Sequence, residues 1–111
     1  MVSKERMCLM IKEIFSGKLP AVLMNPTPFA LEFSSEKVPD SQRLHSVLEE
    51  VSKSLHDQVE IYNVNVDKVP EIQTMYEVKD LPAVILFKDG KPQDKIIGYH
   101  SEQDVHKFLT Q

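Results

Sequence analysis

The chain has 111 residues, of which 41% are hydrophobic and 27% are charged. This balance is typical of one globular domain with a real core, and it excludes the disordered and fibrous classes. The net charge of -4 argues against a nucleic-acid-binding protein, which usually carries a basic stripe, and against one that attaches to anionic membranes.

The single cysteine, Cys8, cannot form an internal disulfide, which excludes the framework of a small secreted domain. The apolar run over residues 7–11 is too short for a signal-peptide core or a membrane span. We therefore expect a cytoplasmic protein that has no membrane association.

The first half of the chain contains two apolar stripes at helical spacing and two short apolar runs. Residues 7–15 predict a first helix that ends at Gly17, and the spacing of apolar residues over 44–55 predicts a second helix. Between them, the runs 21–24 and 29–33 predict strands.

The second half alternates strands with helices and then closes with a hairpin. A strand is predicted over 59–66, and Pro70 suits the first turn of a short helix that buries Ile72, Met75 and Tyr76. The remaining predicted elements are a strand over 83–87, a turn at Asp89–Gly90, a strand over 95–98 and a last helix opened by Ser101. This order predicts an α/β architecture with a mixed sheet.

Several segments resemble the thioredoxin family. The segment 67–71 is similar to the family's "VD…NPEL", the segment 75–83 to "KYGV…IPT", and the segment 87–91 to "FKDGK". The resemblance implies a thioredoxin-like fold with a central mixed sheet of four or five strands flanked by helices. It implies a single domain over 1–111, in which residues 1–28 depart from the family pattern.

The same resemblance aligns residues 33–51 with the family's redox helix. Val38 and Ser41 stand at the two cysteine positions, with Pro39 and Asp40 between them. Dithiol–disulfide exchange needs a thiolate and a second thiol, so this chemistry is absent from positions 38 and 41. We therefore predict that the protein has no catalytic residues and no cofactor, and that it is not an enzyme.

In the family, the bond equivalent to Leu81–Pro82 is cis, and the backbone before the proline pairs with bound peptide. The resemblance thus implies a protein or peptide partner, in an adaptor or chaperone-like role, bound by Lys37, Val38, Pro39, Leu81 and Pro82. The simpler alternative is that Pro39, Asp40 and Ser41 only begin a helix. The oligomeric state stays open.

Glu32 stands where many thioredoxins have a buried aspartate, and we expect Lys37, Lys95 or solvent to compensate its charge. The four histidines, which are His45, His56, His100 and His106, form no metal-ligand pattern. Ser41 and His45 lie one helical turn apart, without a readable catalytic triad.

Three other functions remain open at this point. The chain could be a thiol-dependent redox protein that uses Cys8, although a buried cysteine usually acts as a small hydrophobic residue. It could instead be a spliceosome-type thioredoxin-like protein, a group whose members are longer. The third alternative is a substrate-binding module of the disulfide-isomerase kind, which would normally follow a signal peptide.

Overall fold

The structure, a computed structural model, describes residues 11–55 and 57–111. Five strands form one sheet in the order β1-β3-β2-β4-β5. The elements in chain order are β1 (Ile11–Glu13), the 3₁₀ helix η1 (Ser16–Lys18), α2 (Leu19–Leu23), β2 (Phe29–Ser34), α3 (Pro39–Leu55), β3 (Glu60–Asn65), α4 (Pro70–Met75), β4 (Ala83–Lys88), β5 (Lys91–Ile97) and α5 (Glu102–Leu109).

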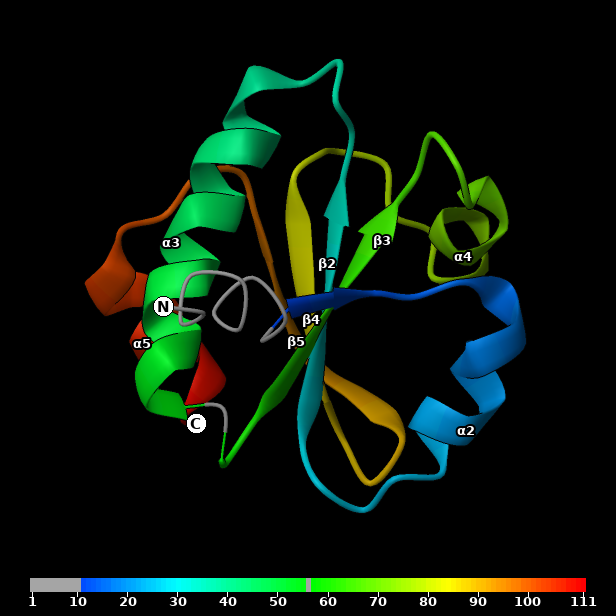
Figure 1. Cartoon of the computed structure of the whole chain (residues 1–111), viewed down its shortest axis with the longest axis horizontal. Coiled ribbons are helices and arrows are strands. Elements are labelled where there is room, and N and C mark those ends of the chain that lie inside the picture. The colour runs from blue at the N-terminus through cyan, green and yellow to red at the C-terminus, as the bar shows by residue number, and fades with distance from the viewer. Residues whose placement is uncertain (1–10, 56) are drawn as a thin grey trace, which may run out of the picture.

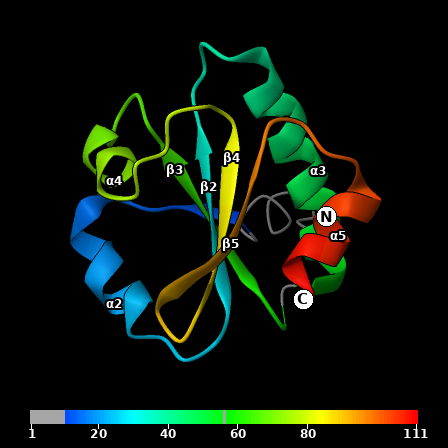
Figure 2. The ribbon, with the colours of Figure 1, turned by 180° about the vertical axis from the view of Figure 1, so that it is seen from behind.

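Helices cover both faces of the sheet. Figures 1 and 2 show α3 and α5 on one face and α2 and α4 on the other. Each face has its own hydrophobic cluster, so the alternating side chains of β2 and β4 are buried on both sides. Within the described ranges, no helix is long and apolar enough to cross a membrane.

The sheet is mixed, as predicted. β3 pairs in parallel with β1 and β2, whereas β4 pairs antiparallel with β2 and β5. The apolar stripe predicted for the central helix is confirmed, because it is buried against the sheet along the length of α3; its members are Leu44, Val47, Leu48, Val51 and Leu55.

The helix predicted over residues 7–15 is wrong for the part that the structure describes. Ile11–Glu13 is a strand, and the N–H of Ile14 donates to the carbonyl of Asn63 at 2.9 Å. Ile11 and Ile14 are both buried, but in the clusters on opposite faces of the sheet. A three-residue spacing puts two side chains on one face of a helix and on opposite faces of a strand. Residues 7–10 lie outside the described residues.

The strand predicted over residues 21–24 is also wrong, because this segment belongs to the helix Leu19–Leu23. Pro20 occupies the first turn of α2, where a missing N–H costs little. Leu19 and Val22 are its buried residues, one helical turn apart. This run of apolar residues is too short for its spacing to distinguish a helix from a strand.

The later elements agree better with the sequence. The Asp89–Gly90 turn joins β4 to β5 and has positive φ at both residues, as a two-residue hairpin of type I′ requires. The Ser101 side chain caps α5 by accepting from the N–H of Asp104. One buried-face prediction is wrong: Met75, at the end of α4, is 58% exposed.

Candidate functional site

The two segments predicted to bind a partner lie at the same end of the sheet, where β2 ends and β4 begins. Phe33, near the end of β2, is the register partner of Ala83, the first residue of β4. The chain after Phe33 and the chain before Ala83 therefore start from neighbouring points. Figure 1 shows this end of the sheet at the top, where α3 begins and the loop into β4 passes.

Val38 and Ser41, at the positions of the family cysteines, form the first turn of the α3 region. The N–H of Ser41 donates to the carbonyl of Val38 at 3.0 Å, and Pro39 is the first residue of the helix. Ser41 is buried, and its Oγ accepts from the N–H of Ser35 at 3.2 Å. The hydroxyl thus holds the β2–α3 loop against the helix.

Asp67, after β3, fixes the same loop from the other side. Both of its carboxylate oxygens accept from the Ser35 hydroxyl, at 3.0 and 2.9 Å, and Oδ2 also accepts from the N–H of Glu36. The Ser35 hydroxyl accepts in turn from the N–H of Lys37 at 3.1 Å. Sequence reasoning missed this role of Asp67, because nothing in the chain order links it to the loop.

The Leu81–Pro82 peptide bond is cis, as the resemblance implied. The Pro82 carbonyl accepts from the N–H of Gly98 at 2.7 Å, which ties the loop to the end of β5. Pro82 is buried and Leu81 is half-buried.

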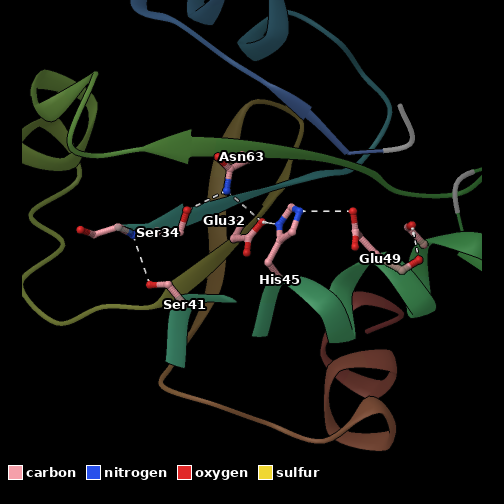
Figure 3. A network of polar contacts seen from close by, with 8 residues as sticks. Glu32, Ser34, Ser41, His45, Glu49 and Asn63 are labelled. Atoms are coloured by element: carbon pink, nitrogen blue, oxygen red, sulfur yellow. Dashed lines mark hydrogen bonds and ion pairs between the residues drawn. The ribbon is translucent and has the colours of Figure 1, made fainter. Parts of the chain in front are cut away.

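A network of polar contacts lies near this end of the sheet (Figure 3). Glu32 on β2 is fully buried, and its Oε1 lies 2.8 Å from His45 Nδ1 and 3.1 Å from Asn63 Nδ2. On the other side of the imidazole, Nε2 lies 3.4 Å from Glu49 Oε2. The prediction that Lys37 or Lys95 pairs with Glu32 is therefore wrong, because an imidazole from α3 and an amide from β3 contact its carboxylate.

The histidine is held between two carboxylates. The hydrogen bond to Glu32 raises the pKa of His45 above its ordinary value of 6.5. Burial opposes this shift, while the negative charges of Glu32 and Glu49 add to it. The arrangement favours the imidazolium, which can donate from both ring nitrogens.

Sequence reasoning recognised Glu32 but did not connect it with His45 and Asn63. A signal was present for part of the network, because positions 41, 45 and 49 follow the four-residue spacing of one helix face. Pairing of that face with β2 could not be read from spacing. His45 Nε2 faces Glu49 rather than Ser41, so the network is not a serine–histidine–acid triad.

Among residues 11–55 and 57–111, no group of three or more His, Cys, Asp or Glu residues could hold a metal ion. Cys8, to which a redox role was assigned as an alternative, lies outside the described residues.

Comparison with known proteins decides the family. The model of the family described as Thioredoxin matches residues 12–111. The chain belongs to the thioredoxin family. A thioredoxin from Rickettsia bellii is 31% identical over 89 residues, which cover 80% of this chain and 85% of that protein. A thioredoxin-like protein from Synechocystis sp. is 28% identical over 88 residues, covering 79% and 84%.

The fold of this thioredoxin-family chain also matches a solved structure, the thioredoxin Mala s 13 of Malassezia sympodialis. The TM-score is 0.84 at 20% sequence identity, over 91% of this chain and 89% of the other. This likeness confirms the predicted thioredoxin-like fold with its mixed sheet.

The prediction that the chain is not an enzyme is wrong at the level of the family. The Rickettsia relatives carry the name thioredoxin, as do relatives from Staphylococcus aureus, and thioredoxins are oxidoreductases. The membership therefore points to a family of redox enzymes. The prediction was based on positions 38 and 41 alone.

Proposed function

We propose that this thioredoxin-family protein binds an extended protein or peptide segment, in an adaptor or chaperone-like role. The binding surface consists of Lys37, Val38, Pro39, Leu81 and Pro82. One observation carries the proposal: no backbone hydrogen bond joins Leu81 to another described residue. A peptide that binds by strand addition uses such free N–H and C=O groups.

The surroundings of Leu81 also suit a partner with apolar side chains. Ile97, which pairs with Ala83, is 46% exposed, and Tyr99 is 42% exposed. The Arg43 guanidinium lies over the Tyr99 ring, 4.2 Å from its centroid. Apolar side chains rimmed by charged groups are typical of binding surfaces.

Charge placed on this surface is expected to weaken partner binding. A partner recovered with the full chain from its host is purified, and its affinity for Val38→Glu and Leu81→Glu is measured by calorimetry. Each variant is expected to weaken binding at least about tenfold, because a carboxylate desolvated against an apolar partner costs more than about 1.4 kcal/mol.

The matched control is Met24→Glu. Met24 is 84% exposed at the end of α2, and this variant is expected to bind like the unmodified chain. Equal affinity for the surface variants and the Met24 variant would contradict the proposed surface. Circular dichroism on each variant separates a loss of binding from a loss of folding.

We also propose that dithiol–disulfide exchange does not take place at positions 38 and 41, which lack sulfur. The turn between them has the right span for a disulfide, since an i→i+3 hydrogen bond brings Cα atoms within about 7 Å. The double variant Val38→Cys with Ser41→Cys is therefore expected to reduce insulin at least about tenfold faster than the unmodified chain, because a thiol at a helix N-terminus has a lowered pKa.

This double variant is made in a Cys8→Ser background, so that its two thiols are the only ones present. Equal rates for the double variant and the Cys8→Ser chain would show that the scaffold no longer supports the exchange. The double variant and the Cys8→Ser chain are assayed at equal protein concentration with a stoichiometric reductant.

The second candidate function is thiol redox chemistry by Cys8, and the names of the relatives favour it. The same insulin assay tests it, with the unmodified chain compared with Cys8→Ser. A rate that Cys8→Ser abolishes supports this candidate. The cytoplasmic location stays a prediction.

A further inference from the structure

A polar pocket of about 350 Å³ opens beside the proposed binding surface, between the β2–α3 loop, α3 and β3. Its volume is within the range of sites for small ligands or single side chains. All nine residues that line it are polar, and four of them are serines. Such a lining offers a ligand several hydrogen-bond donors and acceptors.

The charge around this pocket is negative. Glu36 lines it directly, with a side chain that forms no ion pair with another described residue. Two more carboxylates lie one hydrogen bond behind the wall: Glu32 behind His45, and Asp67 behind Ser35. Among the described residues, no lysine or arginine lines the pocket, and His45 is the one lining residue there that can carry a positive charge.

The buried carboxylate of Glu32 is only partly satisfied. Its Oε1 receives the contacts from His45 and Asn63, whereas its buried Oε2 has no hydrogen-bond partner among the described residues. Figure 3 shows Asn63 and His45 converging on this carboxylate from different elements. His45 balances the charge of this carboxylate, and Oε2 remains an acceptor that no described residue satisfies.

The amide of Asn63 is oriented so that it offers an acceptor. Its Nδ2 donates to Glu32 at 3.1 Å and to the Ser34 hydroxyl at 2.8 Å. A flipped amide would place its oxygen against the carboxylate, so the network fixes the orientation. Both N–H groups are thereby used, and the Oδ1 atom has no partner among the described residues. Gln42 and Ser46 on α3 line the same pocket.

We infer that this pocket binds a guanidinium group, because the Glu36 carboxylate, which has no ion-pair partner among the described residues, and the free Oδ1 of Asn63 belong to the lining of a cavity of side-chain size. A guanidinium is planar and carries five N–H donors, which match carboxylate and amide oxygens at several points. The group can come from an arginine of a partner polypeptide or from a small guanidinium compound. The inference does not depend on the proposed peptide-binding surface.

The test is a titration of the ¹⁵N-labelled full chain with N-acetyl-arginine amide, followed by NMR chemical shifts. The matched probe is N-acetyl-citrulline amide, which has nearly the same shape but no charge. We expect shifts centred on Gln42, Ser46 and Asn63, and an affinity for the citrulline compound at least about fivefold lower. Equal responses to both compounds, or shifts centred elsewhere, would overturn the inference.

Two substitutions at exposed positions test the same pocket without disturbing the core. Glu36→Gln is expected to lower the affinity for the arginine compound about two- to fivefold. Glu102→Gln on α5 is expected to leave that affinity unchanged. Ser46→Arg places a tethered guanidinium at the pocket and is expected to abolish binding, unlike Ser54→Arg on the same helix. Unchanged binding by Ser46→Arg would contradict the site.

A short peptide with one central arginine distinguishes the two sources of the group. Tighter binding of this peptide than of the amide compound assigns the pocket to a polypeptide partner, and equal binding assigns it to a small molecule. The peptide is tested again with Leu81→Glu, so that failure of the proposed binding surface and failure of the pocket are seen separately.

Discussion

Replacing Gly90 with alanine is expected to lower the free energy of unfolding by about 2–4 kcal/mol. A Cβ atom on Gly90 would lie 2.4 Å from the carbonyl oxygen of Leu23, a backbone atom at the end of α2. The residue also has a φ of +76°, which L residues with side chains rarely adopt. Neither the hairpin nor α2 can move freely, because both pack on the sheet.

The other two glycines separate these two causes. Gly98 has a φ of +86° but no atom within 4 Å of its added Cβ, so Gly98→Ala is expected to cost only the conformational part, about 1–2 kcal/mol. Gly17 has neither constraint, and Gly17→Ala is expected to change stability by less than about 0.5 kcal/mol. Urea unfolding of the three variants measures the series, and equal losses for Gly90→Ala and Gly98→Ala would contradict the close contact with α2.

The second prediction concerns the pH dependence of stability. Because its pKa is raised in the folded chain, His45 binds its proton more tightly there than in the unfolded chain. Its stabilising contribution is therefore complete below pH 6.5 and is lost as the pH rises through the folded pKa. We expect the free energy of unfolding to fall over that window as the pH rises.

Removing the imidazole exposes the same effect. His45→Gln is expected to cost about 1.5–3 kcal/mol at pH 6, because the buried Glu32 carboxylate loses a charge-assisted hydrogen bond. The loss is expected to shrink as the pH rises, since neutral His45 stabilises the carboxylate less. Urea unfolding at a series of pH values, from about one unit below 6.5 upward, measures both effects.

His106→Gln is the matched control, because His106 is an exposed histidine on α5. It is expected to keep the pH dependence of the unmodified chain. Glu32→Gln is expected to remove the dependence as His45→Gln does, because the raised pKa of His45 has the Glu32 hydrogen bond as its largest cause. A pH dependence that persists in both substitutions would show that the pair does not control stability.

The family signal and the order of elements from Phe29 onward could be read from the sequence. β2, α3, β3, β4 and α5 lie where the apolar periods predicted them, because each combines a clear period with recognisable end signals such as Pro39 and Ser101. The site was predictable only through the resemblance, which placed Val38, Ser41 and Leu81–Pro82 in one region.

The N-terminal elements and the polar network behind the site were not predictable in the same way. Residues 11–24 have apolar spacings that fit a helix or a strand, and pairing of Ile11–Glu13 with β3 decides between them. Likewise, His45 meets Glu32 only because α3 packs across β2.

The sequence by itself determined that positions 38 and 41 have no thiol, because that property belongs to the side chains and not to their arrangement. The tertiary structure decided what surrounds those positions: a loop held by Ser41 and Asp67, and a polar pocket in front of the buried Glu32 carboxylate and its partner His45. These contacts join residues 6 to 32 positions apart in the chain, and the packing of α3 on the sheet together with the parallel pairing of β2 and β3 brings them within hydrogen-bonding distance.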